Sequence, residues 1–574
     1  MLAALPVLIV DCQATLAAPR GHVIELGWAL SPAGSVTGAP IAASARLVRL
    51  PEGERVPRGV TRITGITDDL LAGGVPVEDA WRELVRDARM LSVAPTPTVA
   101  HFARFERPFL ARLAGDTPPL DIVCTHEIAL RLFPDLPRRG LRALAGYFGH
   151  SVGALRRSAE HVVATSFVWQ HLAALLDERG VRSWSDLRAW LEEPVRRPSR
   201  AKRGWPMPRE LRLALPDRPG IYRMLRTSGD VLYVGKAASL HKRVNSYFRK
   251  QTGIHERTLE MLSQARGLSY LVAESPLEAA LLEPDEIKQS RPPYNEALME
   301  TDRAVWFARA DLSAKSPRAG SGLAVGPGSL EGEQWACATC TGPFPSAVLL
   351  DRLDALIARE PTAIAPARWA PPAAVLEEGL ALLGRAHPEL AQLAQLAERI
   401  ERRPLLVLGA RLWREGRRLR EDDDAVAERR AHPTDAGPLF ARVWTPAQVA
   451  TEIEGLALQC AHAIRRARWL TALVESTVTF REPSAASARL LVLSDGEIVR
   501  RERAPDDGVP PVPERYRRSR SERHAGFTIA RFDRLRVLTT ELKRLVAKGS
   551  PVSVRLAPRA TLAGERLVRI LGWL

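Results

Sequence analysis

Residues Pro219–Phe248 read PGIYRMLRTSGDVLYVGKAASLHKRVNSYF, and this stretch decides the fold of the middle of the chain. Two β-rich runs, GIY and YVG, flank the turn signal Ser228–Asp230, a pattern that predicts a β-hairpin. Each run pairs a tyrosine with a glycine, Gly220 in the first and Gly235 in the second. Because glycine has no Cβ, both positions allow the backbone to approach a substrate closely.

A helix is predicted directly after this hairpin. Leu240, Val244 and Phe248 recur four residues apart, which is the spacing of one helical face. Lys236 precedes this helix, and Arg243 lies off its apolar stripe and is free to face a cleft. Tyrosine hydroxyls can orient or deprotonate a water, and cations can neutralise a phosphorane-like transition state. This set of groups therefore suits cleavage of a phosphodiester.

A second helix is predicted downstream, where Ser275–Asn295 reads SPLEAALLEPDEIKQSRPPYN. Ser275 is a favourable N-cap, Pro276 suits the first turn, and Glu278 completes a capping box. The segment ends in a proline-rich stretch followed by tyrosine and asparagine.

Together these segments resemble the GIY-YIG nuclease domain, most closely the N-terminal nuclease half of the excision-repair protein UvrC and its shorter Cho-like relatives. The resemblance covers the hairpin, the helix after it, an LE pair and a PxYN ending. It implies that one Mg²⁺ or Mn²⁺ ion is held by a carboxylate and the substrate phosphate. The roles that it implies are water positioning and activation by Tyr222 and Tyr233, phosphate binding by Lys236 and Arg243, metal binding by Glu283, and completion of the site by Asn295.

This segment departs from the family pattern at two places. Pro284 follows Glu283 directly, and a residue before proline is pushed away from helical geometry. We therefore expect the helix to kink or end at the metal ligand. Ala238 and Ser239 replace the small polar residues that usually follow the lysine.

The N-terminal third resembles the DnaQ-like 3′–5′ exonucleases, which have an RNase H-like fold. Leu5–Asp11 is an apolar run that ends in an aspartate, as in the first motif of that family. The matching later segments are Thr61–Gly73, Val99–Leu110, Asp121–Gly149 and Leu155–Leu172.

The catalytic positions of this domain are altered. The family uses four carboxylates to hold two metal ions and a histidine as general base. The corresponding residues here are Asp11, Gln13, Glu106, Arg156 in place of the histidine, and His161 in place of the final aspartate. Two adjacent divalent cations need dense negative charge, and arginine does not act as a base. We expect a DNA-binding or scaffolding module without exonuclease activity, although a shift of one residue in the last motif would use Glu160 instead.

Composition fits a multidomain, nucleic-acid-binding protein. The chain has 574 residues, a net charge of +16 and a pI of about 10.2, which favour several domains and a polyanionic partner such as DNA. Five cysteines in this length indicate a reducing compartment, and the single pair Cys337 and Cys340 is too few ligands for zinc or an iron–sulfur cluster. No secretory signal or run of transmembrane length is recognised, so we expect a cytoplasmic, nucleoid-associated bacterial protein.

The predicted fold class is multidomain α/β and α+β. In order along the chain, we expect an RNase H-like exonuclease fold, a GIY-YIG α/β nuclease fold, a helical region and a small C-terminal domain that contains β-strands. The predicted boundaries are 1–180 for the exonuclease-like domain, 181–208 for a linker, 209–300 for the GIY-YIG domain, 301–335 for a linker, 336–480 for the helical domain and 481–574 for the C-terminal domain. The predicted DNA-binding arginines are Arg465, Arg466 and Arg468 on a helix, and Arg517, Arg518 and Arg520 in an arginine-dense loop.

The function that these patterns favour is a Mg²⁺-dependent DNA endonuclease of the UvrC/Cho type. It would cut near a lesion in nucleotide excision repair, with DNA and a UvrA/UvrB-like damage-loading complex as partners and no membrane. Two alternatives remain: an active 3′–5′ exonuclease in replication or repair, and a non-catalytic DNA-binding scaffold in which both sites have decayed.

Overall fold

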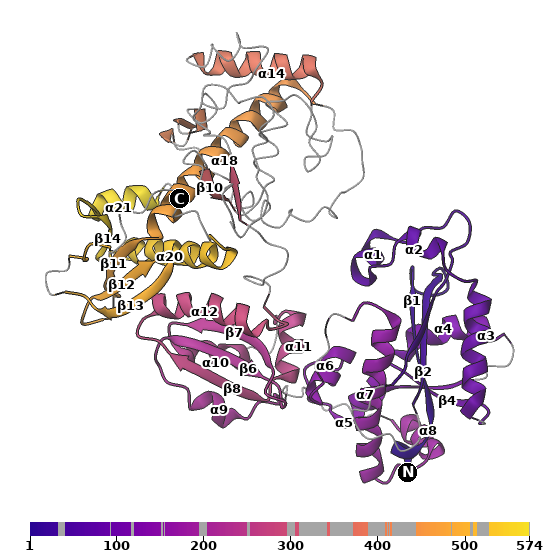
Figure 1. The fold of residues 1–574 in the computed structure, drawn as a ribbon. Helices are drawn as coiled ribbons and strands as arrows, with labels where there is room; N and C mark the ends of the chain where they lie inside the picture. The colour runs from indigo at the N-terminus through magenta and orange to yellow at the C-terminus, as the bar shows by residue number, and fades with distance from the viewer. Residues whose placement is uncertain are drawn as a thin grey trace. The chain divides into compact units, whose positions relative to one another are not determined.

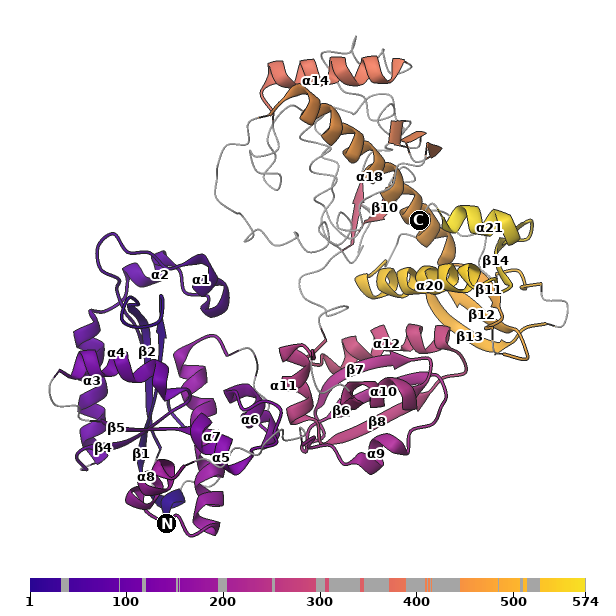
Figure 2. The ribbon, with the colours of Figure 1, turned by 180° about the vertical axis from the view of Figure 1, so that it is seen from behind.

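The computed structural model shows an N-terminal α/β domain, a small α/β domain with a three-stranded sheet, and a helical and β-rich C-terminal part (Figures 1 and 2). Its contacts divide the chain into two compact units, Met1–Ala279 with Gln289–Ala297, and Ala280–Lys288 with Leu298–Leu574. The structure describes residues 1–31, 41–91, 93–115, 120–150, 153, 155–194, 204–249, 253–295, 305–308, 341–344, 371–388, 408–409, 411–412, 414–415, 444–483, 485–505, 509–513, 527–572 and 574.

A five-stranded sheet forms the centre of the N-terminal domain. Its order is β3-β2-β1-β4-β5, in which the first three strands are antiparallel and β4 and β5 run parallel to β1. This arrangement is the RNase H-like fold that the sequence predicted. The strands are β1 (Val7–Ala14), β2 (Val23–Ser31), β3 (Ser44–Leu47), β4 (Thr96–Ala100) and β5 (Leu120–Cys124).

Helices cover both faces of this sheet. Consecutive residues of β1 point to opposite sides, so this strand contributes apolar residues to the core on each face. Val7 and Ile9 pack with the helices α5 to α8, whereas Leu8 and Val10 pack with α3 and α4. A strand buried on both faces reads as a continuous apolar run. The helices are α1 (Arg58–Thr64), α2 (Asp68–Ala72), α3 (Val77–Ala88), α4 (Ala103–Ala114), α5 (Thr125–Leu132), α6 (Leu141–Tyr147), α7 (Ser158–Glu178) and α8 (Trp184–Glu192), with short 3₁₀ turns at Leu2–Ala4 and Arg89–Leu91.

Helix α8 corrects the predicted linker at 181–208. Leu187 of this helix is fully buried in the core that α7 forms with the sheet, and Trp184 packs against the same core. The Nε1 of Trp184 also donates to Asp121 at 2.8 Å. The N-terminal domain therefore continues to the end of α8. The prediction followed the proline- and arginine-rich stretch Arg196–Pro208 and extended the linker back over the apolar residues of α8.

The second domain contains the predicted hairpin and the helix after it. Its sheet has the order β7-β6-β8, with all neighbours antiparallel. Leu240, Val244 and Phe248 are buried on one face of α10, as their spacing predicted. The elements are α9 (Arg209–Leu213), β6 (Gly220–Leu225), β7 (Val231–Ala237), α10 (Leu240–Arg249), α11 (Glu256–Gln264), β8 (Gly267–Val272) and α12 (Pro276–Ser290).

Helix α12 begins as predicted but does not end as predicted. The backbone N–H of Glu278 donates to the Ser275 side chain at 3.1 Å, which caps the first turn. The helix then runs through Pro284 to Ser290, so it does not end at Glu283, and the alternative of a kink there stays a prediction. A proline inside a helix removes one backbone hydrogen bond, but burial of the surrounding helix can offset that loss.

The remaining elements belong to the second compact unit. Its five-stranded sheet is antiparallel in the order β13-β12-β11-β14-β15, and the predicted hairpin turn is formed by Asp495 and Gly496, both with positive φ. Strand β11 starts before the predicted boundary at 481. The elements are β9 (Trp306–Ala308), β10 (Thr341–Phe344), α14 (Ala373–Ala386), α18 (Pro446–Leu473), β11 (Ser476–Phe480), β12 (Arg489–Ser494), β13 (Glu497–Arg503), α20 (Ile529–Ala547), β14 (Val552–Ala557), β15 (Ala560–Ala563) and α21 (Gly564–Leu571).

Residues of α12 that belong to this unit are tied to α20 by two ion pairs. Lys288 Nζ lies 3.0 Å from Asp533, and both side chains are at most one-tenth exposed. Arg534 donates to Asp285 at 2.8 Å. These pairs fix the helical segment that carries Glu283.

Several predictions fall on residues outside the described ranges. They are the pair Cys337 and Cys340, the arginine-dense loop with Arg517, Arg518 and Arg520, and most of the linker at 301–335. Among the residues that the structure does describe, no helix is long and apolar enough to cross a membrane.

The position of α8 gives a first testable prediction. Replacing the fully buried Leu187 by alanine should lower the free energy of unfolding by about 2–5 kcal/mol, because it leaves a cavity in the core. Thermal unfolding of the full chain measures this change. Leu130→Ala is the matched control, because Leu130 is 38% exposed and should change stability by less than about 0.5 kcal/mol. Equal effects of the two changes would contradict the assignment of α8 to the domain core.

Candidate active sites

Three tyrosines meet at one end of the β6–β7 hairpin. Tyr222 comes from β6, Tyr233 from β7 and Tyr247 from α10, and their ring centroids lie 6.1–6.4 Å apart. The hydroxyls of Tyr222 and Tyr247 are 2.9 Å apart and share a hydrogen bond. Sequence reasoning named the first two and missed Tyr247. Its position four residues after Arg243, one helical turn away, was the signal that could have found it.

The hairpin register explains why a glycine stands at position 235. Gly235 lies directly opposite Tyr222 across the two strands. A Cβ at this position would be 2.4 Å from the Tyr222 hydroxyl and 2.8 Å from the Tyr233 ring, much closer than van der Waals contact. Gly235 therefore leaves the space that the Tyr222 side chain fills. The glycine of the other run, Gly220, is constrained similarly, because its Cβ would lie 2.3 Å from the Leu271 carbonyl oxygen.

Burial keeps the central hydroxyl of this cluster protonated. The side chain of Tyr222 is fully buried, and desolvation, followed by the charges that Tyr247 and Tyr233 would carry, raises its pKa well above the usual value. Arg243 opposes this shift, and its guanidinium lies 5.2 Å from the centre of the Tyr247 ring. The cluster thus presents hydroxyl groups that can orient a water, beside a cation on the exposed face of α10.

Lys236 and Asn295 occupy different environments. Lys236 is exposed at the end of β7, opposite Ile221. The side-chain amide of Asn295 accepts from the Val234 N–H at 2.9 Å and donates to the Val234 carbonyl at 2.9 Å, so it mimics a strand neighbour of β7. Asn295 therefore anchors the PxYN ending beside Tyr233, which favours a positioning role.

Glu283 is the carboxylate that the resemblance assigns to the metal. It lies half-buried on α12, near the middle of that helix. In the part of the chain that the structure describes, no group of three or more His, Cys, Asp or Glu side chains is arranged to hold a metal. Mg²⁺ commonly binds through one or two carboxylates together with waters and substrate phosphates. A glutamate carboxylate is a hard oxygen donor of the kind that this ion binds.

The exonuclease-like site brings Asp11 and His161 into contact. The Nδ1 of His161 lies 3.1 Å from Asp11 Oδ1, and the Gln13 amide donates to Asp11 Oδ2 at 3.3 Å. Burial favours the neutral imidazole, but the hydrogen bond and charge of Asp11 outweigh it and raise the pKa of His161. This shift favours a protonated imidazole at a position where a metal ion would need a further carboxylate.

Glu106 is buried near the same aspartate. Desolvation, and then the negative charge of Asp11, raise the pKa of Glu106 to about 9, and its Oε2 atom makes no hydrogen bond. Near neutral pH the carboxyl group is therefore protonated. One anionic carboxylate does not fit two divalent cations.

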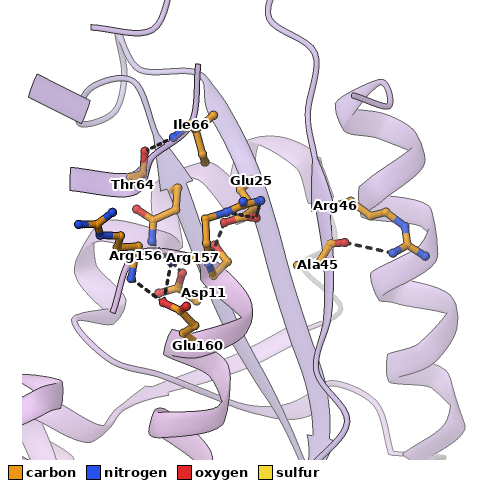
Figure 3. A network of polar contacts seen from close by, with 11 residues as sticks. Asp11, Glu25, Ala45, Arg46, Thr64, Ile66, Arg156, Arg157 and Glu160 are labelled. Carbon is orange, nitrogen blue, oxygen red and sulfur yellow. Dashed lines mark hydrogen bonds and ion pairs between the residues drawn. The ribbon is translucent and has the colours of Figure 1, made fainter. Parts of the chain in front are cut away.

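The start of α7 uses the remaining charged residues of this region for its own capping (Figure 3). Glu160 accepts hydrogen bonds from the backbone N–H groups of Arg156 at 2.7 Å and Arg157 at 3.2 Å. The buried Glu25 of β2 pairs with the Arg157 guanidinium and accepts from the Ser158 N–H at 2.7 Å. The structure thus places His161, rather than Glu160, against Asp11.

The predicted basic end of α18 lies within the described chain. Arg468 is exposed, and Arg465 and Arg466 are half-buried. Burial, followed by the charges of Arg414 and Arg468, lowers the pKa of Arg465 to about 10. An anion nearby would stabilise cations that are crowded and partly desolvated in this way. DNA binding at this end of α18 therefore stays a prediction.

The crowding at Gly235 generates a second prediction. Gly235→Ala should lower the free energy of unfolding by about 1–3 kcal/mol, because the Tyr222 side chain must move. Thermal unfolding monitored by near-ultraviolet circular dichroism would record the loss. Gly59→Ala serves as the control, since a Cβ there meets no atom within 4 Å. An unchanged transition for Gly235→Ala would show that the tyrosine cluster does not need this space.

The protonated Glu106 generates a third prediction. Glu106→Gln should raise the free energy of unfolding by about 1–3 kcal/mol near neutral pH. The folded pKa of about 9 lies above the ordinary value of 4.5, so the stability of the natural protein falls as pH rises between these values. Glutamine stays neutral and avoids that loss. Urea unfolding at about pH 4 and about pH 7 should show the gain only at the higher pH.

The exposed Glu78 provides the matched control, and Glu78→Gln should leave stability unchanged at both pH values. If Glu106→Gln instead destabilised the protein near neutral pH, the carboxyl group would be ionised in the folded state, and the site would be better suited to cations than its geometry indicates.

Comparison with known proteins places these sites in context. Residues 218–296 match the family model of the UvrC-like GIY-YIG domain. The chain is 32% identical over 312 residues to a Mycobacterium tuberculosis protein named "Putative bifunctional exonuclease/endonuclease protein", a match that covers 53% of this chain and 46% of the relative. It is also 41% identical over 133 residues to the UvrABC system protein C of a Psychrobacter species, over 23% of this chain and 20% of the relative.

The chain thus spans less than half the length of these two relatives. One similar solved structure is the GIY-YIG N-terminal endonuclease domain of UvrC from Thermotoga maritima, bound to magnesium as its catalytic divalent cation. It is 35% identical, the match covers 15% of this chain and 94% of that domain, and the TM-score is 0.14. The family match and the mycobacterial relative agree with both resemblances seen in the sequence. Residues 218–296 are a UvrC-like GIY-YIG domain, which this chain joins to an N-terminal domain with a DnaQ-like exonuclease fold.

Proposed function

We propose that this protein is a Mg²⁺-dependent DNA endonuclease of the UvrC/Cho type, which hydrolyses a phosphodiester near a lesion in nucleotide excision repair. The observation that carries the proposal is the cluster of Tyr222, Tyr233 and Tyr247 beside Arg243, within the segment that matches the UvrC-like family. A buried, hydrogen-bonded set of hydroxyls next to an exposed cation is suited to a water and a phosphate at adjacent positions.

Different residues of this chain orient the water and bind the phosphate. The hydroxyls of Tyr233 and of the Tyr222–Tyr247 pair orient the attacking water, while Arg243 and Lys236 bind the phosphate oxygens. As the water oxygen bonds to phosphorus, the bond to the leaving oxygen breaks; the attacking water releases a proton to solvent, and the leaving oxygen takes one from solvent. Charge grows on the phosphate during this step, and the two cations stabilise it. A Mg²⁺ ion held by Glu283 would supply Lewis-acid activation of the phosphate and the water.

Tyrosine hydroxyls contribute position and hydrogen bonds in this scheme. The raised pKa of Tyr222 keeps its proton in place, so it can pass a hydrogen bond from Tyr247 toward the water without carrying a charge. Asn295 holds the chain against β7 at Val234 and so keeps the neighbouring Tyr233 in its place.

The N-terminal domain in this proposal has lost its exonuclease activity and contributes DNA binding. The contact of His161 with Asp11 and the protonated Glu106 leave too little negative charge for two metal ions. The net charge of +16 favours DNA as the partner of the whole chain. Delivery to the lesion by a UvrA/UvrB-like complex is part of the proposal because UvrABC system protein C is among the relatives.

A cleavage assay tests this function. Purified protein with Mg²⁺ is given an end-labelled duplex that contains one bulky lesion, with and without a damage-loading complex. We expect one discrete product, and a loss of at least about 100-fold for Arg243→Ala, which removes a charge that stabilises the transition state. Glu283→Gln should abolish cleavage but retain DNA binding. Lys242→Ala and Glu286→Gln are the neighbouring controls on the same helices.

Two outcomes would contradict the proposal. A ladder that shortens from the 3′ end and disappears in Asp11→Ala would mean that the exonuclease-like site is active. Binding without any cleavage, unchanged by Glu283→Gln, would identify the protein as a scaffold.

A further inference from the structure

A cavity of about 480 Å³ lies within the first compact unit, between the exonuclease-fold domain and helix α11 of the GIY-YIG domain. Figures 1 and 2 both show α6 beside α11, and the two helices are in contact. The approach is close, because a Cβ at Gly146 of α6 would lie 1.8 Å from the Gln264 side chain. The Arg138 N–H donates to Ser263 Oγ at 2.9 Å, which joins the two walls of the cavity.

The lining of this cavity is rich in arginine. Arg138, Arg139, Arg142 and Arg257 all contribute to it, together with two glutamates. Both glutamates are engaged, since Arg138 pairs with Glu256, and Arg142 Nε lies 3.5 Å from Glu260. Arg257 donates to the Pro293 carbonyl at 2.9 Å, and among the described residues neither glutamate forms an ion pair with Arg139.

Arg139 is held in place by backbone carbonyl groups. Its guanidinium donates to the backbone carbonyls of Phe133, at 2.7 Å, and Pro134, neither of which is charged. Burial lowers its pKa, and the nearby Asp135 offsets part of this shift. A hydrogen bond to an anionic oxygen, such as that of a phosphate, would stabilise an oriented and partly desolvated guanidinium of this kind.

An aromatic pair forms another part of the lining. The ring of Phe102 stacks on the His126 ring with centroids 4.3 Å apart and planes inclined by 30°. Phe102 is 40% exposed, and its backbone has a φ of 62°, a left-handed conformation that is unfavourable for a bulky residue. Burial, and then the charges of Arg139 and Arg104, lower the pKa of His126, which keeps the ring neutral and suited to stacking. A strained backbone that holds an aromatic ring exposed in this way is typical of a binding position.

We propose that this cavity holds an unpaired nucleotide of a DNA strand, with its base stacked on Phe102 and His126 and its phosphate bound by Arg139. Stacking surfaces combined with cations are the means by which proteins bind single strands without reading their sequence. The cavity has the size of sites that hold one small ligand. The inference rests on the proposed function in that DNA is the substrate, and it assigns the exonuclease-fold domain a role in holding a strand beside the nuclease domain.

The test measures binding of a fluorescent oligothymidylate to the full chain by anisotropy, without divalent ions, so that no cleavage is needed. Phe102→Leu should weaken binding by roughly 5- to 100-fold, because it removes one base-stacking surface. Phe102→Trp should retain the affinity, because it keeps an aromatic ring. If Phe102→Leu bound as tightly as the natural protein, or if Phe102→Trp bound as weakly as Phe102→Leu, the proposal would be overturned.

The phosphate contact is tested separately by the salt dependence of the same binding. Arg139→Gln should lower the slope of log affinity against log salt by about 0.7, the value for one phosphate on a single strand. Arg139→Lys should retain the slope, since it keeps the charge, whereas a loss in both variants would indicate a structural role and contradict the proposal. Arg82→Gln and Leu130→Ala are controls that lie outside the cavity lining and should change neither measurement.

A competition experiment identifies the source of the nucleotide. Unlabelled oligothymidylate should displace the probe, and thymidine monophosphate at the same molar concentration should not. Displacement by the mononucleotide would overturn the assignment to a strand. The outcome is independent of endonuclease activity, because an inactive protein that still shows the Phe102 and Arg139 effects would fail the proposed function and support this inference.

Discussion

The close approach of Tyr222 to the backbone of Gly235 is the constraint on which the central domain depends. The two residues are opposite each other in the β6–β7 register, and there is no room for a Cβ between them. This contact buries the Tyr222 ring and directs its hydroxyl to Tyr247 on the following helix. A hairpin, a helix and a hydrogen-bonded pair of phenols are thereby fixed at one point, and Arg243 on the same helix brings a cation to that point.

Charge balance explains the different character of the two sites. In the GIY-YIG domain the groups in contact are hydroxyls and a cation, which suit a phosphate and one metal ion held by a single carboxylate. In the exonuclease-fold domain Asp11 is paired with His161, and Glu106 is buried beside it. The raised pKa values of His161 and Glu106 both reduce the negative charge at this edge of the sheet. The fold of this domain persists because its core depends on alternating apolar residues of β1 and not on the chemistry at its edge.

The exonuclease-fold domain also contacts the GIY-YIG domain of the same chain. Its helix α6 packs on α11, and the arginines and aromatic rings near this contact line a cavity. Aromatic and cationic side chains near the ends of β4 and β5 are suited to hold nucleic acid. The proposed strand binding would give this domain a role that does not depend on exonuclease activity.

The sequence by itself determined the elements whose signals are local. The hairpin with its two glycines, the apolar face of α10, the capped start of α12 and the apolar run of β1 all follow from residue spacing over a few positions, and each is present. Other features depended on contacts between distant segments. Tyr247 contacts Tyr222, which lies 25 residues earlier in the chain. Asn295 pairs with Val234, 61 residues earlier, and α8 packs in the core of the first domain. Local spacing can place a residue such as Tyr247 on one side of a helix, but the contact itself is decided by which surfaces the folded chain brings together and buries.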